Sequence, residues 1–111
     1  MHDISKSDWK QYREKIGDWQ ERYMEQLIKE YVLCLSSDCT ASEKFWELER
    51  RIKKDKKHPG VLIDVQKSSM LYDILHLINS NVITMEDLKD FSEDLQEDIQ
   101  FFLGIKNKKW L

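Results

Sequence analysis

No proline interrupts the chain between Ser7 and Ser36, and large apolar residues recur there at steps of three or four. This period places side chains along one side of an α-helix, whereas a half-buried strand would alternate. The recurring residues are Trp9, Tyr12, Ile16, Trp19, Tyr23, Leu27 and Tyr31. The spacing predicts a helix over 7–36, about 42 Å long, whose only weak point is Gly17.

The two halves of this predicted helix differ in pattern. Its first half carries a narrow apolar seam between charged neighbours, like one side of a coiled coil. Its end, "LIKEYVLCLSS", is apolar on nearly all sides, and we expect this end to lie deep in the fold.

The seam is a candidate interaction surface, because the first helix is predicted to extend past the shorter helices that follow it. It consists of Trp9, Tyr12, Ile16, Trp19 and Tyr23. An exposed apolar stripe of this kind requires a cover. We consider two covers: the C-terminal segment 105–111, through Ile105, Trp110 and Leu111, or the same seam on a second chain in a homodimer.

Two shorter helices are predicted next. The second helix is expected over 41–57, since Thr40 can cap it and Glu43 can complete a capping box. It must stop before Pro59, which disfavours helical geometry in the preceding residue. The third helix is expected over 61–79, where apolar residues again recur at helical spacing.

The fourth helix, predicted over 85–103, has the clearest start in the chain. Thr84 and Asp87 form a capping box, and Ile83 can pack against Leu88 as a hydrophobic staple. Apolar residues then step by three or four: Leu88, Phe91, Leu95, Ile99 and Phe102. Gly104 is expected to end the helix, and residues 105–111 to form a flexible tail.

The short connections between these helices decide the predicted architecture. Links of about four to six residues favour antiparallel neighbours. We therefore predict an all-α fold, a four-helix arrangement with a long first helix and three shorter antiparallel helices, in a single domain spanning 1–111.

The composition agrees with helices and disfavours several other classes. Three glycines and one proline in 111 residues are too few for the many tight turns of a sandwich or barrel. The net charge of −3 gives no overall field toward nucleic acid or anionic lipid. The longest apolar run is "YVLCL", so we expect no membrane span, and the first residues lack a secretory pattern, so we expect a cytoplasmic location.

Residues with catalytic or metal-binding potential are scattered. His2, His58 and His76 show no ligand spacing. Cys34 and Cys39 are expected as reduced thiols, although the sequence leaves open whether they pair. Since no glycine-flanked serine and no phosphate-cradling loop is present, we predict no enzymatic activity, no metal and no cofactor.

The most charged stretch is "RRIKKDKKH", residues 50–58, and it has three interpretations. Its basic residues are Arg50, Arg51, Lys53, Lys54, Lys56 and Lys57. Cations in the last turn of a helix interact favourably with the helix dipole and need no ligand. A local basic patch can also contact nucleic-acid phosphates, or it can be attracted to the acidic fourth helix, within one chain or across a dimer.

Aromatic residues gather in the first half of the chain: Trp9, Tyr12, Trp19, Tyr23, Tyr31, Phe45 and Trp46. They can form an aromatic core or dimer seam, a docking groove for a partner protein, or a pocket for small aromatic ligands.

Three segments, "SEKFWELERRIKKDKKHPGV", "MLYDILHLI" and "VITMEDLKDFSEDLQE", follow one another in this order. In this succession, from about Trp9 to Phe102, the chain resembles a group of small uncharacterised all-helical bacterial proteins, some of them labelled "multidrug transporter". No segment has the roughly 20 apolar residues of a spanning helix, which contradicts that label taken literally. The resemblance transfers no site residues.

The sequence as a whole favours a protein–protein interaction or regulatory module. The partner is expected to be a second copy of the chain or another protein. Two alternatives stay open: a nucleic-acid-associated regulator that uses residues 50–58, and a binder of small aromatic ligands.

Overall fold

The computed structural model describes residues 3–108, with side chains through Gly104, and this part of the chain contains helices and no strand. The α-helices are α1 (Lys6–Leu35), α2 (Ala41–Asp55), α3 (Met70–Asn79) and α4 (Glu93–Lys108). Two short 3-10 helices, η1 (Lys67–Ser69) and η2 (Met85–Leu88), precede α3 and α4. The predicted all-α, four-helix arrangement with a long first helix is confirmed. Within the described range, no helix has both the length and the apolar character needed to cross a membrane.

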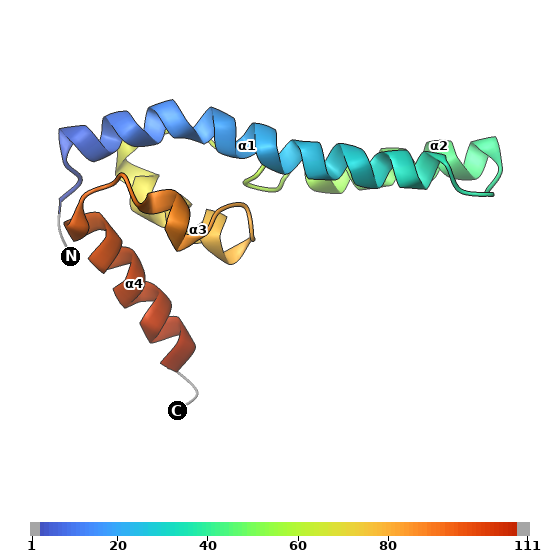
Figure 1. Ribbon diagram of the computed structural model, residues 1–111. Helices are drawn as coiled ribbons and strands as arrows, with labels where there is room; N and C mark the ends of the chain where they lie inside the picture. Colours follow the sequence, from blue (N-terminus) through green and yellow to red (C-terminus); the bar gives the residue numbers. More distant parts are fainter. Residues whose placement is uncertain (1–2, 109–111) are drawn as a thin grey trace.

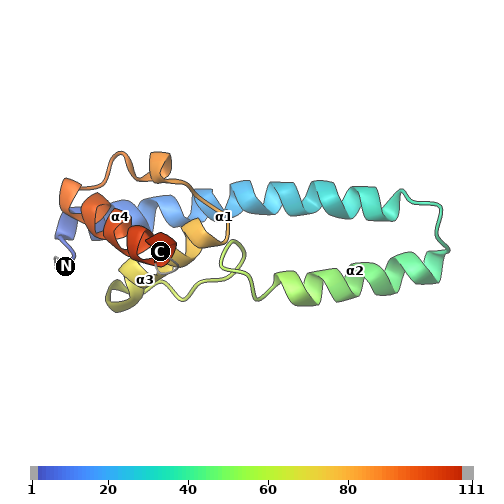
Figure 2. The ribbon, with the colours of Figure 1, turned by 90° about the horizontal axis from the view of Figure 1, so that it is seen from below.

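The molecule is elongated because α1 belongs to two different parts of it (Figure 1). At 1.5 Å per residue, α1 is about 45 Å long. Its first half lies against α3 and α4, and its second half pairs with α2 in an antiparallel hairpin (Figure 2). The radius of gyration is 17.2 Å, whereas a compact chain of this length would have about 13 Å. We call the hairpin of residues 24–55 the arm and the remainder the core end.

The hydrophobic core lies entirely at the core end. It gathers buried side chains from the first half of α1, from α3, from the η2 region and from α4: Tyr12, Ile16, Trp19, Met70, Ile74, Leu77, Val82, Ile83, Leu88, Phe91, Leu95 and Ile99. The ring of Trp19 has its centroid 6.3 Å from that of Tyr12 and 6.1 Å from that of Phe91. The apolar stripe at the start of α1 is therefore an internal packing surface.

The expectation that this seam is left uncovered is wrong, and so is the expectation that the end of α1 lies deep. Tyr12 is fully buried, whereas Leu33 is 73% exposed. The reason is the order in which the helices pair. Since α2 folds back on the second half of α1, only the first half remains for α3 and α4. The alternative cover from Ile105, Trp110 and Leu111 falls outside the described side chains.

The third helix is shorter than predicted, because Val61 still belongs to a turn, residues 62–66 form no helix, and a helical turn begins only at Lys67. Val61, Ile63 and Val65 are β-branched and alternate with other residues, a period of two that suits extended chain. Ile63 packs against the core from this non-helical segment. At about 15 Å, α3 is therefore too short to reach along the whole of α1.

The fourth helix also departs from its predicted bounds. The capping box is present, since the Thr84 N–H donates to the Asp87 carboxylate at 2.9 Å, but it starts only the short turn η2. The helix α4 starts anew after Ser92, whose hydroxyl accepts from the Leu95 N–H at 3.2 Å. Gly104 does not end α4, because it adopts ordinary helical geometry with no positive φ. Residues 105–108 are therefore helical, and the remainder of the predicted tail, 109–111, lies outside the described residues.

A buried carboxylate joins the starts of α1 and α4. Asp8 is 3% exposed and lies in the first turn of α1, which Ser5 caps. The Asp8 carboxylate accepts from the Ser92 N–H at 2.9 Å and from the Ser92 hydroxyl at 2.5 Å. The same hydroxyl caps α4, so this pair fixes where α4 begins relative to α1.

Replacing Asp8 with Ala is expected to lower the free energy of unfolding by about 2–3 kcal/mol, because a hydrogen bond to a charged group contributes about 1.5–3 kcal/mol. Urea denaturation followed by circular dichroism measures the change. The matched control is Asp18→Ala at an exposed position of α1, where the expected change is within about 0.5 kcal/mol. Equal losses in both variants would contradict the assigned role of Asp8.

Candidate interaction surface

The arm buries very little of its own apolar surface. Among residues 24–55 only Leu27 is buried, and α2 contributes no buried side chain. Two helices alone cannot enclose a core, since each covers only one side of the other. The arm therefore keeps two sides that neither of its helices covers, and these sides are its candidate binding surfaces.

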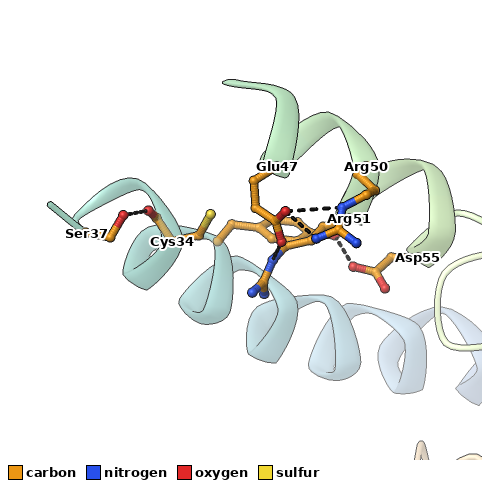
Figure 3. A network of polar contacts seen from close by, with 7 residues as sticks. Cys34, Ser37, Glu47, Arg50, Arg51 and Asp55 are labelled. Atoms are coloured by element: carbon orange, nitrogen blue, oxygen red, sulfur yellow. Dashed lines mark hydrogen bonds and ion pairs between the residues drawn. The ribbon is translucent and has the colours of Figure 1, made fainter. Parts of the chain in front are cut away.

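One open side of the arm is polar (Figure 3). Beside this side, where the two helices meet, the Tyr31 hydroxyl of α1 donates to the Asp55 carboxylate of α2 at 2.6 Å. Burial together with this hydrogen bond raises the pKa of Tyr31 to about 12. On α2, Glu47 accepts from the guanidinium groups of Arg50 and Arg51, which lowers the pKa of Glu47. This side is internally paired.

The other open side of the arm is apolar. On α1, Ile28, Val32 and Leu35 are 56%, 54% and 44% exposed and recur at steps of four and three. On α2, Phe45, Leu48 and Ile52 recur at steps of three and four, and they line a shallow groove. Each triplet therefore forms a stripe along one side of its helix. We call these six residues the apolar arm face.

The two stripes lie on the same side of the hairpin. At 3.6 residues per turn, each stripe is displaced by roughly a quarter turn, in the same rotational sense, from the side on which its helix meets the other. The meeting sides are marked by Leu27 and Tyr31 on α1 and by Arg51 and Asp55 on α2. Because the helices are antiparallel, equal displacement brings both stripes to one side. The hairpin is therefore amphipathic as a unit.

The apolar arm face also points away from the core end. Ile28, Val32 and Leu35 lie roughly 160° around α1 from Tyr12, Ile16 and Trp19, counted at 3.6 residues per turn. Since α3 and α4 pack on the stripe of Tyr12, Ile16 and Trp19, neither helix can cover the apolar residues on the opposite side of α1. The face is open along the length of the arm.

The base of the arm is held to α1 by the segment "HPG", residues 58–60. The imidazole of His58 stacks on the ring of Tyr23 with centroids 4.5 Å apart and planes 2° from parallel. The Gly60 N–H donates to His58 Nδ1 at 3.0 Å, and Gln20 Nε2 donates to the Pro59 carbonyl at 3.1 Å. Pro59 and Gly60 are buried. These contacts set the angle at which α2 leaves the core end.

A methyl group at Gly60 has no room, because a Cβ there would lie 2.3 Å from the Tyr23 ring. Gly60→Ala is therefore expected to displace Tyr23 and to lower the free energy of unfolding by about 1–3 kcal/mol. Gly17→Ala is the matched control, since nothing lies within 4 Å of a Cβ at that helical position. It should raise stability by about 0.5–1 kcal/mol. Thermal unfolding measures both, and a neutral Gly60→Ala would refute the assigned contact.

His58 is expected to make stability depend on pH. Burial lowers the pKa of His58 below its usual 6.5, with His76 acting in the same direction and Asp55 opposing them. The unfolded chain therefore binds the proton more readily, so the contribution of neutral His58 is complete above about pH 6.5 and is lost as pH falls through the lowered folded pKa.

The pH effect is measured as the difference in free energy of unfolding between the wild type and His58→Gln, from about pH 7.5 to pH 5. This difference should shrink as the solution becomes acidic. Subtraction removes the opposite contribution of Asp73, whose pKa burial raises. A difference that stays constant over the range would contradict the assignment.

The residues of the sequence-predicted seam pack at the core end and do not form an exposed surface. Tyr12, Ile16 and Trp19 are buried in the core, Trp9 packs against it, and Tyr23 stacks on His58. Of the other aromatics, Phe45 and Trp46 lie on α2 with ring centroids 5.0 Å apart and are 62% and 64% exposed. The aromatic residues therefore do not form one cluster.

The basic stretch lies at the end of α2, and its six side chains are exposed: Arg50, Arg51, Lys53, Lys54, Lys56 and Lys57. Attraction to the acidic fourth helix within one chain is not the observed arrangement, because α2 and α4 lie at opposite ends of the molecule (Figure 2). Acidic residues before α4 instead pair with α1, through Lys15–Asp90 at 3.3 Å and Arg22–Asp87 at 3.2 Å. Contact of the stretch with nucleic acid stays a prediction.

The thiols and carboxylates form no metal site in the described part of the chain. Cys34 is half-buried, Cys39 is exposed, and both are free. No three His, Cys, Asp or Glu side chains between residues 3 and 104 lie close enough together to hold a metal ion.

The sequence prediction missed the apolar arm face as a surface, although both stripes can be found by their spacing. Its α1 stripe fell within the segment expected to lie deep. The α2 stripe belongs to a helix that was expected to pack within a four-helix arrangement. The alternation in residues 61–65 was the signal that α3 starts late.

Comparisons with protein-family models, with curated proteins and with solved structures find no match to this chain. The function proposed below is therefore supported by the geometry and chemistry of the arm alone.

Proposed function

We propose that the protein is a cytoplasmic protein–protein interaction module, not an enzyme, and that the apolar arm face is its docking surface. The observation that carries the proposal is the exposure of two aligned apolar stripes on the side of the arm that no other helix within residues 3–108 covers. The core end acts as the folded base from which the arm is presented.

The size of the exposed surface supports this role. Aromatic side chains carry about 150–250 Å² each, so Phe45, at 62% exposure, leaves roughly 100–150 Å² in water. Ile28, Val32, Leu35 and Ile52 add to this area on the arm. Contiguous apolar patches above a few hundred Å² on soluble proteins mark interaction sites.

The rigidity of the arm base also supports docking. Tyr23, His58 and Gly60 hold α2 against α1 at the core end, and Tyr31 and Asp55 join the two helices further along. A surface that is fixed before binding loses less conformational freedom when the partner arrives. The arm is therefore suited to docking without refolding.

Site-specific photocrosslinking in the native cell tests the proposal. A photoreactive phenylalanine analogue at Phe45 is expected to give a discrete adduct on irradiation. The same analogue at Leu33, an exposed arm position outside the apolar arm face, is the matched control and should give none. The adduct at Phe45 should disappear when Ile52→Gln is added on the same face.

Two results would overturn the proposal. One is the absence of any adduct at Phe45. The other is equal labelling at Phe45 and Leu33, because nonspecific contact with exposed apolar side chains does not depend on the face.

A further inference from the structure

We infer that the apolar arm face binds the same face of a second copy of this chain, with the two arms antiparallel, so that two hairpins form a four-helix bundle. The inference rests on the proposed function and names the partner of the same surface. The result is an isologous dimer, in which one surface patch meets itself across a two-fold axis.

The geometry of the arm suits this partner. Two amphipathic helices side by side present one flat apolar side, and two such sides face to face enclose the core of a four-helix bundle. The face points away from α3 and α4, so neither core end obstructs the approach of the second arm. Face-to-face pairing would cover Phe45 and Ile52, which the single chain leaves 62% and 38% exposed.

The area lies below the range of standard specific interfaces. The arm is about 22 Å long along α2 and two helices, roughly 20 Å, wide. Its footprint of about 450 Å² per chain gives roughly 900 Å² of buried surface for two chains, without the extra area of side chains that project from the helices. Standard interfaces bury about 1,200–2,000 Å². The dimer is therefore in equilibrium with the monomer and depends on concentration.

Charge selects the antiparallel orientation. Along α2 the basic residues gather toward the end, and of the acidic residues only Glu49 lies beside the apolar arm face, since Glu43 and Glu47 point roughly 130–170° away from it at 3.6 residues per turn. Parallel arms would place the two basic ends at the same end of the bundle, and like charges at an interface are unfavourable. Antiparallel arms bring Lys53 of each chain toward Glu49 of the other. Glu49, Lys53 and Lys56 line the groove itself, where this complementarity acts.

Sedimentation equilibrium of the purified full chain at low salt tests the inference, from micromolar to submillimolar protein. The average mass should rise with concentration from 13.4 kDa to twice that value. Phe45→Gln with Ile52→Gln should raise the dimer dissociation constant by at least about tenfold. Leu33→Gln with Trp46→Gln removes two exposed apolar side chains outside the face and should change the constant by less than about threefold.

Charge-reversal variants test the antiparallel orientation. Lys53→Glu with Lys56→Glu should weaken the dimer, and adding Glu49→Lys to the same chain should restore part of the loss. Raising the salt concentration should weaken the wild-type dimer, because exposed charges are screened. Circular dichroism of each variant verifies that the helices are retained.

Cys39, at the tip of the arm, provides a test of how the two arms are oriented relative to each other. In a Cys34→Ser chain, antiparallel arms keep the two Cys39 residues about one arm length apart, roughly 22 Å or more, whereas a disulfide requires Cα atoms within about 7 Å. Mild oxidation should therefore give no linked dimer through Cys39. A chain with Cys34→Ser, Cys39→Ser and Glu49→Cys places its thiol near the two-fold axis and should become linked.

Each contrary result is decisive. A chain that stays monomeric over the whole concentration range, or equal effects of the face and control pairs, overturns the dimer. A dimer linked through Cys39 overturns the antiparallel orientation. If the chain is monomeric but Phe45 still crosslinks to another protein in the cell, the docking function stands and only the second copy fails; without any adduct, both fail.

Discussion

The structure depends on the division of one long helix between two sets of neighbours. The first half of α1 buries Tyr12, Ile16 and Trp19 against α3 and α4, and this burial supplies the only extensive core in the described chain. Residues 24–35 of α1 instead pair with α2. Because a helix can cover only one side of another, the arm keeps an open polar side and an open apolar side.

Short polar contacts determine where the division falls. Asp8 and Ser92 join the start of α1 to the start of α4, so the last helix stays at the core end. Contacts among Tyr23, His58 and Gly60 likewise hold the segment that follows α2 against α1 at the core end. These contacts involve few atoms, yet each one fixes the start or the end of a helix, and so they set the boundary between core and arm.

Electrostatics and burial have separate roles in the arm. Arg50 and Arg51 are paired with Glu47 on their own helix, and exposed pairs of this kind add little stability. The free energy available for association comes instead from the apolar arm face, through removal of its side chains from water. Charge at the rim affects which orientation is favoured and how fast partners meet. In an interface of modest area, apolar burial therefore supplies the free energy of association and charge supplies the orientation.

The sequence by itself determined the helical class, the continuous first helix and the local starts at Thr40 and Thr84, because periodicity and capping act over a few residues. It also determined which side chains form each apolar stripe. What it could not decide is which stripe is covered, since coverage depends on how far each later helix reaches. A local alternation in residues 61–65 and a cap at Ser92 shortened α3 and moved α4. Only the tertiary structure then decided that Trp19 is core and Phe45 is surface, because burial is a property of neighbours distant in the chain and not of the stripe itself.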